Sequence, residues 1–290
     1  MWTPNDKVTK CLMHRPPDKF AGMLQQGKPA AVDEKITVKR EKIYSHYWLE
    51  QVEGDLDLTP FDEFDRLVLD ACISAQNNGD VGITKNEIAR IISGGKSIKQ
   101  MPKPPAELIE RITLSLNRLM CRRIRIDFSQ LAATGKYPKL DASGRLTDMV
   151  LPCALLENVE VNGQRHVDFV YFRGTSPLLS LARAKNQQLL SYPIDLLDVP
   201  NLKNNARIAV IKSYVVRRVL EIKTHKNLTP KITFDDVFDN CGLVNAAKQT
   251  KMNARNVILK VLNHLKTKEI IRDFEIEKNG KSYHAVKVVR

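Results

Sequence analysis

The last third of the chain follows one order of secondary-structure signals more clearly than any other stretch. Two long amphipathic runs, residues 204–223 and 252–268, enclose a shorter helical segment that begins near Thr233. Two strand-forming runs then close the chain. They are joined by Asn279-Gly280, a pair that accepts the positive φ angles of a two-residue hairpin turn. The order helix, helix, helix, hairpin predicts a small three-helix unit that carries a β-hairpin at its end.

The second long run separates into an apolar face and a polar face. Apolar residues recur at the spacing of one helix face, and they are Ala254, Ile258, Val261 and Leu265. The other side carries Lys251, Arg255, Asn256, Asn263 and Lys266. Thr233 and Asp236 are spaced to cap the start of the short helix that lies between the two long runs. A hydroxyl accepts hydrogen bonds from free N–H groups, and an acid favours the positive end of the helix dipole. This pattern predicts a winged helix-turn-helix domain over residues 204–290.

Positive charge is concentrated in the same stretch. Residues 201–290 hold 19 Lys and Arg against 8 Asp and Glu, a net of +11, whereas residues 1–200 hold 27 against 25, a net of +2. Nearly all of the formal charge of +13 therefore lies in this domain. Lysine and arginine bind DNA phosphates by displacing condensed counterions, so the distribution favours a duplex DNA reader whose third helix enters the major groove. The alternative is a solvated basic surface that binds RNA or an acidic partner.

The same order of signals begins earlier, over residues 58–190. Thr59-Pro60 predicts a helix start, and helical spacing continues to about Gln76. Thr84 with Glu87 three residues later is a capping-box signal for a short second helix. These signals predict the first two helices of a second unit of the same kind.

A third helix is predicted over residues 106–122, again with two faces. Its apolar face is formed by Ile109, Ile112, Leu116 and Leu119. Its opposite face carries Arg111, Ser115, Arg118 and Arg122. A strand over residues 124–128, an insertion over about 129–147 and a hairpin that turns at Asn162-Gly163 complete the unit. The chain is therefore predicted to be a helix-rich α+β protein with two tandem winged helix-turn-helix domains.

Two further regions, residues 1–57 and 191–203, lie outside these domains. The first is predicted to be an N-terminal extension that is partly disordered, because prolines and glycines interrupt residues 1–34 and no periodicity survives. Residues 35–58 alternate loosely and are suited to add a strand to the first domain. Residues 191–203 are predicted to be an extended linker between the two domains.

The residues present disfavour several classes of site. Five scattered cysteines without a CxxC pair favour a reducing compartment and argue against a disulfide or zinc framework. The segment Ser93–Ser97 resembles the end of a phosphate-binding loop, but the first glycine of such a loop would fall at Arg90. The six histidines include no His-x-His pair for a metal. His264 and His284 better suit a DNA contact or a satisfied polar surface. We therefore expect no enzyme activity, no cofactor and no metal.

Two further observations bear on where in the cell the protein is found. No run approaches the 18 apolar residues of a membrane span. The N-terminus lacks the apolar segment of a signal peptide. The sequence predicts a cytoplasmic protein without a membrane partner.

The duplicated pattern resembles the plasmid replication initiators built from two tandem winged-helix domains. The similarity is carried by LTPFDEFDRLVLDA at residues 58–71, YPIDLLDV at 192–199 and VVRRVLEIK at 215–223, and by the C-terminal basic helix with its hairpin KNGKSYHAVKV. It covers roughly residues 58–290. The N-terminal extension and the insertion after Phe128 depart from the common pattern.

The resemblance implies a DNA-binding initiator of a plasmid or another mobile genetic element, without catalytic chemistry. Such proteins bind repeated origin sites, help open a neighbouring AT-rich segment and recruit a helicase or primase. Many bind their own promoter as dimers through the first domain, which implies a monomer–dimer equilibrium here. Carried onto this chain, the major-groove residues of the first domain are Arg111, Ser115, Arg118 and Arg122. Those of the second domain are Lys251, Arg255, Asn256 and Asn263. The wing residues are Lys278, Asn279 and Lys281.

Three functions stay open at this point. The first is a replication initiator, the second is a transcription regulator that uses the same two domains, and the third is an assembly adaptor whose basic domain binds protein or RNA. Salt-dependent duplex binding with a sequence preference separates the first two from the third. Repeated sites beside an AT-rich segment separate initiator from regulator. Within either DNA reader, Asn256 is able to bond adenine through two hydrogen bonds.

Overall fold

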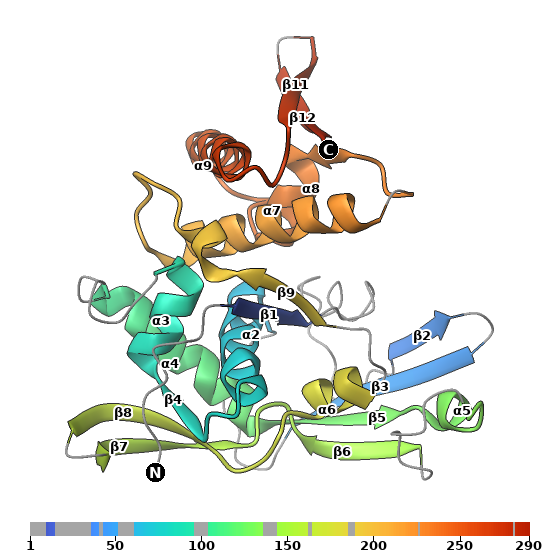
Figure 1. Ribbon diagram of the computed structural model, residues 1–290, viewed down its shortest axis with the longest axis vertical. Helices are drawn as coiled ribbons and strands as arrows, with labels where there is room; N and C mark the ends of the chain where they lie inside the picture. Colours follow the sequence, from blue (N-terminus) through green and yellow to red (C-terminus); the bar gives the residue numbers. More distant parts are fainter. Residues whose placement is uncertain are drawn as a thin grey trace.

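The computed structural model describes residues 10–14, 36–40, 43–51, 61–95, 104–135, 144–161, 164–184, 189–225, 227–280 and 282–290. Over these residues, helices are combined with four small antiparallel sheets. Figure 1 shows the C-terminal unit, in orange and red, above the rest of the chain. Among the described helices, none is long and apolar enough to cross a membrane.

The first unit is built around α2 (Glu63–Asn77), a helix buried along nearly its whole length. Asp62 caps its N-terminus: the Asp62 carboxylate accepts a hydrogen bond from the Asp65 N–H at 2.9 Å, and the Asp65 carboxylate accepts one from the Asp62 N–H at 2.9 Å. The helix therefore begins after the predicted start at Thr59-Pro60, which lies outside the described residues. An aspartate cap satisfies the free N–H groups as well as a threonine does.

Three elements follow: β4 (Gly82–Thr84), α3 (Lys85–Ser93) and α4 (Ala106–Cys121). The predicted capping box of α3 is confirmed, since Thr84 Oγ1 accepts from the Glu87 N–H at 3.1 Å and the Glu87 carboxylate accepts from the Thr84 N–H at 2.7 Å. Two strands complete the unit: β7 (Cys153–Val161) and β8 (Gln164–Phe172). In their sheet, β8 lies between β4 and β7. The predicted turn at Asn162-Gly163 lies outside the described residues.

A second sheet combines two strands that precede α2 with two strands that lie between α4 and β7 in the chain. Its strands, in spatial order, are β2 (Ile36–Arg40), β3 (Ile43–Gln51), β5 (Arg122–Asp127) and β6 (Arg145–Met149). The short helix α5 (Ser129–Ala132) follows β5. The antiparallel pairing of β3 with β5 confirms that residues 35–58 add a strand to the first unit.

The β-prone run over residues 149–161 is divided between two sheets. The chain leaves β6 at Met149, bends, and enters β7 at Cys153. Val150 and Leu151 are buried in the core. Pro152 has no N–H to donate to a strand ladder. Burial of two apolar side chains and the missing donor explain why this run does not continue as one strand.

Two segments far apart in the sequence pair as β1 (Lys10–His14) and β9 (Leu189–Pro193). The prediction of disorder over residues 1–34 is therefore wrong for β1. Its hydrogen-bonding partner comes from the far end of the first unit, so no local pattern indicates it. The helix α6 (Pro177–Ala184) precedes β9 and begins at proline, as expected for a first helical position.

The connection between the units is packed rather than extended. It contains the 3-10 helix η2 (Ile194–Leu197). The prediction of an extended linker over residues 191–203 is wrong in this respect. The buried side chains of this segment are Tyr192, Ile194, Leu196, Leu197 and Val199. Their burial between the two units removes apolar surface from water, which stabilises a defined path for the chain.

The C-terminal unit repeats the order of the first. Its elements are α7 (Ala206–Thr224), β10 (Lys231–Thr233), α8 (Phe234–Asn240), α9 (Lys248–Thr267), β11 (Asp273–Asn279) and β12 (Ser282–Val289). The predicted cap of α8 is confirmed, since Thr233 Oγ1 accepts from the Asp236 N–H at 3.0 Å. The sheet order β10-β12-β11 corresponds to β4-β8-β7 in the first unit. The two units therefore share both element order and sheet order.

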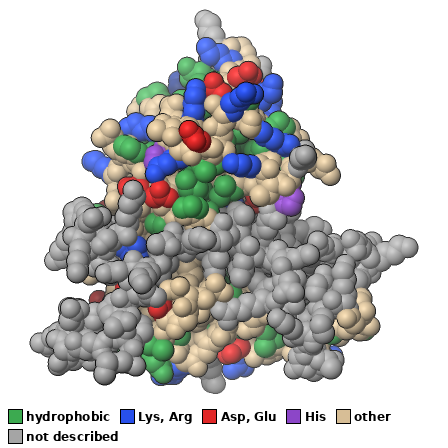
Figure 2. Space-filling view, viewed as in Figure 1, with side chains coloured by type: hydrophobic (Ala, Val, Ile, Leu, Met, Phe, Trp, Pro, Cys, Tyr) green, Lys and Arg blue, Asp and Glu red, His purple; other side chains and the backbone are tan. Residues whose placement is uncertain are grey.

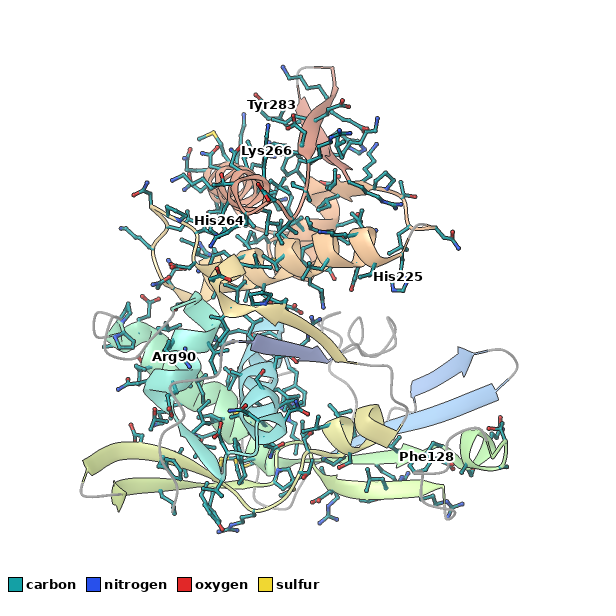
Figure 3. All side chains as sticks on the ribbon, in the orientation of Figure 1. Arg90, Phe128, His225, His264, Lys266 and Tyr283 are labelled. Carbon is teal, nitrogen blue, oxygen red and sulfur yellow. The ribbon has the colours of Figure 1, made fainter. Side chains whose placement is uncertain are left out.

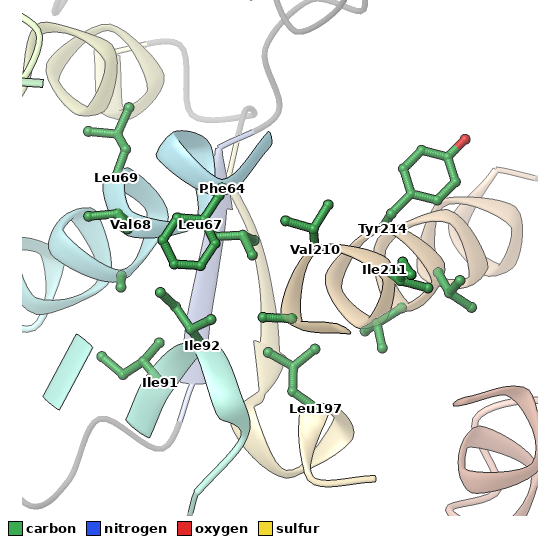
Figure 4. Packing of buried hydrophobic residues seen from close by; sticks show 14 of the residues in the cluster. Phe64, Leu67, Val68, Leu69, Ile91, Ile92, Leu197, Val210, Ile211 and Tyr214 are labelled. Carbon is green, nitrogen blue, oxygen red and sulfur yellow. The ribbon is translucent and has the colours of Figure 1, made fainter. Parts of the chain in front are cut away.

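One continuous hydrophobic core joins the two units. Figure 4 shows Phe64 and Leu67 of α2 and Ile92 of α3 beside Leu197 of η2 and Val210 of α7. All five side chains are buried. Because water is excluded along this boundary, the two units are held together by the same hydrophobic effect that holds each of them.

Buried polar contacts cross the same boundary. Lys212 Nζ of α7 donates to the Ser93 carbonyl oxygen of α3 at 3.0 Å. Arg217 of α7 lies 3.6 Å from the Glu63 carboxylate of α2. Burial lowers the pKa of Lys212 to about 8, and the Asp198 charge acts in the opposite direction. Charged groups in such a place are stabilised only by the partners that face them, so these contacts define how the units meet.

Candidate nucleic-acid interface

The helix α9 has one buried side and one solvent-exposed side. Its buried residues are Ala254, Val257, Ile258, Val261, Leu262 and Leu265. They pack into the core, and Figure 1 shows α9 on the side of α7 away from the first unit. The exposed side forms a line of residues at helical spacing, which we call the outward stripe: Gln249, Met252, Asn253, Asn256, Lys260 and Asn263.

The outward stripe contains the predicted residues Asn256 and Asn263, together with amides that the sequence interpretation missed. Gln249 and Asn253 were missed because the helix was predicted to begin at Met252, whereas α9 begins at Lys248. The helical period extended backwards from Asn256 would have indicated both. Gln249 Nε2 donates to Asn253 Oδ1 at 3.1 Å. The stripe is therefore mostly polar and uncharged.

A basic flank runs beside the outward stripe and is formed by Lys248, Lys251 and Arg255. The Arg255 guanidinium carbon lies 5.5 Å from the ring centre of Phe234 and 5.6 Å from that of Phe238. Lys251 Nζ lies 5.6 Å from the Phe238 ring centre. Cations are attracted to the faces of aromatic rings, so α8 orients both side chains. The predicted polar face is thus split, with the amides directed outward and Lys251 and Arg255 directed along α8.

Arg255 keeps hydrogen-bonding capacity in this position. It is half-buried, and its Nε atom is buried without a hydrogen-bond partner among the described residues. A guanidinium has five N–H donors in a rigid fork. The rings of Phe234 and Phe238 offer no hydrogen-bond acceptor oxygen. An anion approaching the flank would therefore meet the solvent-exposed part of an oriented guanidinium, whereas the buried Nε would not contact it.

The start of α9 adds to the attraction for anions. Its N-cap residue, Ala247, has no side-chain hydrogen bond to the helix, and its first turn holds no acidic residue. The helix N-terminus carries partial positive charge, which disfavours Lys248 and Lys251 in the absence of an anion. Free N–H groups and nearby lysines together suit a phosphate.

The β11–β12 hairpin carries the remaining predicted residues. Lys278 is exposed, and its Nζ lies 5.4 Å from the Tyr283 ring centre. The strand register shifts at Glu277 and Lys278, which bends the hairpin near its turn. The Asn279 side chain and Lys281 lie outside the described residues. Figure 3 shows Tyr283 on the hairpin and Lys266 on the neighbouring part of α9.

Some basic residues of the C-terminal unit form ion pairs with carboxylates, and others do not. Four lysines pair with carboxylates, in the pairs Lys231–Glu277, Lys266–Asp273, Lys268–Asp195 and Lys287–Glu275. Within the described part of the chain, no ion pair is formed by Lys248, Lys251, Arg255 or Lys278. Figure 2 shows lysine and arginine side chains over the visible face of this unit. The cations without an ion pair in the described residues therefore include those at the start of α9 and near the hairpin turn.

The corresponding helix of the first unit has a different surface. The predicted groove-facing set on α4 is wrong for Ser115 and Arg118, which are buried. Ser115 Oγ donates to Asp65 of α2, and Arg118 donates to both oxygens of the same carboxylate, at 2.6 and 3.1 Å. Burial raises the pKa of Asp65, while the hydrogen bonds from Arg118 and Ser115 act in the opposite direction. An acid on the neighbouring helix turns this polar face inward.

The other two predicted residues, Arg111 on α4 and Arg122 at the start of β5, also contact α2 or the residues that precede it. Arg111 pairs with Asp62, and its guanidinium lies 5.5 Å from the Phe64 ring centre. The Arg122 guanidinium lies 4.6 Å from the ring centre of Phe61. The exposed positions of α4 include Glu107, Glu110, Leu114 and Asn117. This acidic and apolar surface does not suit contact with phosphates.

The two histidines singled out in the sequence differ in position. His264 is turned toward the connecting segment, where its Nε2 lies 3.0 Å from the Asp195 carbonyl oxygen (Figure 3). His284 is exposed on β12. Among the described residues, no cluster of His, Cys, Asp and Glu could hold a metal ion.

Comparisons with known proteins give matches among solved structures alone. No family model and no curated protein sequence matches the chain. The chain is similar to the crystal structure of a selenomethionine derivative of domains 2 and 3 of RctB, with 11% identity, a TM-score of 0.44, and coverage of 95% of this chain and 98% of that chain. A second crystal structure of RctB domains 2-3 matches with 10% identity, a TM-score of 0.45, and coverage of 93% of this chain and 96% of that one.

Proposed function

We propose that the protein is a sequence-specific double-stranded DNA-binding replication initiator with two tandem winged-helix domains. In this proposal α9 enters the major groove. The β11–β12 hairpin contacts phosphates or the minor groove beside it. The repeated element order and sheet order support the winged-helix assignment.

The observation that carries the DNA-binding proposal is the surface of α9. The outward stripe presents amides that are able to hydrogen-bond base edges. Directly beside it, the basic flank presents three cations without carboxylate partners in the described residues. Base readers next to phosphate-binding cations are the two components of a specific protein–DNA interface. The formal charge of +11 over residues 201–290 supports the same interpretation.

The initiator role is supported by the resemblance of residues 58–290 to plasmid replication initiators. The first domain is proposed to mediate dimerisation rather than groove contact. The exposed surface of α4, where Leu114 follows the acidic residues Glu107 and Glu110, supports a protein partner at this place. Recruitment of a helicase or primase belongs to the same proposal.

Two experiments test the proposal in order. The full chain is first incubated with a pool of random-sequence duplexes, and the bound fraction is sequenced and titrated at several salt concentrations. We expect a defined recognition sequence, with affinity that falls linearly in log–log form as salt rises. Binding without any sequence preference, or equal binding to RNA, would instead support the adaptor function.

The second experiment separates initiator from regulator. A supercoiled plasmid that carries repeats of the selected site beside an AT-rich segment is treated with permanganate, which modifies unpaired thymines. An initiator is expected to produce reactive thymines in the AT-rich segment when the repeats are present. Specific binding without such opening would favour the transcription regulator, which uses the same DNA-binding surface.

A further inference from the structure

The outward stripe differs from the basic flank in its chemistry. Four of its side chains are amides: Gln249, Asn253, Asn256 and Asn263. Its cation is Lys260, whose Nζ donates to the Asn201 carbonyl oxygen at 3.3 Å. Arg255 and Lys251 lie on the flank, directed along the aromatic rings of α8. Within α9, which the structure describes throughout, no arginine therefore lies on the stripe.

A stripe of amide side chains is expected to bind one of the two purine bases in preference to the other. In the major groove guanine presents two acceptors, N7 and O6, and is bonded bidentately by arginine or lysine. Adenine presents one acceptor, N7, and one donor, the N6 amino group. An amide side chain offers one NH₂ donor and one carbonyl acceptor, so it matches adenine and not guanine. The stripe thus has the hydrogen-bonding pattern of an adenine reader.

Two neighbouring features agree with this match. The Gln249–Asn253 hydrogen bond uses one lone pair of Asn253 Oδ1 and leaves its NH₂ group and second lone pair available. Met252, which is 47% exposed, lies on the same stripe about one helical turn before Asn256. An apolar side chain in this place suits the thymine methyl group, which also lies in the major groove.

We infer that α9 reads A·T base pairs, with Asn253 and Asn256 bonding adenine N6 and N7 and Met252 touching a thymine methyl group. The inference rests on the proposed function and adds the class of base pair that the site takes. The basic flank then supplies affinity without base preference, because Lys251 and Arg255 are held over the rings of α8, beside the amides that read bases.

The test is made at the level of single atoms. The full chain is titrated against its selected duplex and against duplexes in which one adenine at a time is replaced by 7-deazaadenine, which lacks N7. At the adenines read by the stripe, we expect a loss of affinity of about 5- to 150-fold, because the amide NH₂ is left without its acceptor while the bond to N6 remains. Replacement of guanines by 7-deazaguanine in the same site is expected to leave affinity unchanged.

Two variants and a control assign the contacts. Asn256→Ala and Asn253→Ala should each become insensitive to 7-deazaadenine at one position, since a contact already removed cannot be lost twice. Gln130→Ala, at an exposed position of α5, should keep the wild-type pattern. Specific binding that depends on guanine N7, or adenine sensitivity that neither variant abolishes, overturns the inference but leaves the proposed function intact. Absence of sequence-specific duplex binding overturns both.

Discussion

Two arginines with similar sequence surroundings have opposite environments. Arg118 and Arg255 both lie opposite an apolar helix face and were both predicted to face DNA. Arg118 is buried and bonded to both oxygens of Asp65, whereas Arg255 is half-buried against two phenylalanine rings. Asp65 lies on another helix, 53 positions earlier in the chain. The helical period of α4 alone therefore does not reveal it.

The burial of Arg118 predicts that its substitution lowers the stability of the protein rather than its DNA affinity. Arg118→Ala should lower the free energy of unfolding by about 3–5 kcal/mol, because Asp65 is left buried without its cation. The DNA affinity of the fraction that remains folded should stay unchanged. Urea unfolding and gel-shift titration measure the two quantities. A loss of DNA affinity at unchanged stability would show that Arg118 contacts DNA after all.

Lys212 supplies a second prediction at the residue scale, through pH. Its pKa falls from 10.5 to about 8 on folding because of burial. Between these pH values the unfolded chain holds a proton that the folded chain has released, so the contribution of Lys212 to stability rises with pH across this window. The total rise is about 3 kcal/mol at 1.36 kcal/mol for each pH unit.

Urea unfolding at several pH values between 8 and 10.5 tests this prediction against a matched variant. Lys212→Met keeps a side chain of similar length without the titrating group. Relative to this variant, the wild-type protein should gain stability as pH rises. Parallel curves for the two proteins would contradict a lowered pKa at Lys212.

At the scale of elements, helix boundaries follow the local capping chemistry. The caps at Thr84 and Thr233 were predicted from a hydroxyl followed by an acid three residues later, and both are present. The start of α9 was misplaced because Ala247 provides no such signal. The end of α3 depends on Gly94, whose φ of +88° is a left-handed conformation. Its surroundings come from the distant η2 segment rather than from α3.

The surroundings of Gly94 therefore predict a large loss of stability when a single carbon atom is added at this position. A Cβ atom at this position would lie 2.2 Å from the Asp198 nitrogen and 2.3 Å from the Leu197 carbonyl carbon, both backbone atoms. Gly94→Ala should destabilise the protein by more than the roughly 1–2 kcal/mol of a left-handed alanine alone. Gly79→Ala is the matched control, since its φ is +87° and nothing lies within 4 Å of the added carbon. Equal losses in thermal unfolding would mean that the contact with η2 is unimportant.

At the scale of the whole molecule, charge is separated from the boundary between the units. The cations of the basic flank lie at the start of α9. The first unit, whose helix α2 packs against α7, lies on the side of α7 away from α9 (Figure 1). The surface proposed for DNA and the surface that joins the units are therefore distinct. Binding at α9 leaves the contacts between α2 and α7 in place.

This separation predicts how salt acts on variants of the basic flank. Arg255→Ala should weaken binding to different duplexes by a similar factor and reduce the slope of log affinity against log salt by about one. Stability should change little, because the residue is half-buried and forms no ion pair in the described part of the chain. Titrations at several salt concentrations, with Arg118→Ala as comparison, measure the slope. A loss confined to one DNA sequence would instead identify Arg255 as a base reader.

Local residue patterns are sufficient to indicate the identity and order of most helices, the caps at Thr84 and Thr233, and the concentration of charge in the last third. These properties depend on residues within a few positions of one another, so periodicity and composition reveal them. Which polar helix face meets solvent depends instead on contacts between distant segments. Asp65 draws the face of α4 inward, and the rings of α8 orient Arg255. The pairing of β1 with β9 was likewise decided by distant partners, because a hydrogen bond or ion pair between remote segments leaves no trace in either segment alone.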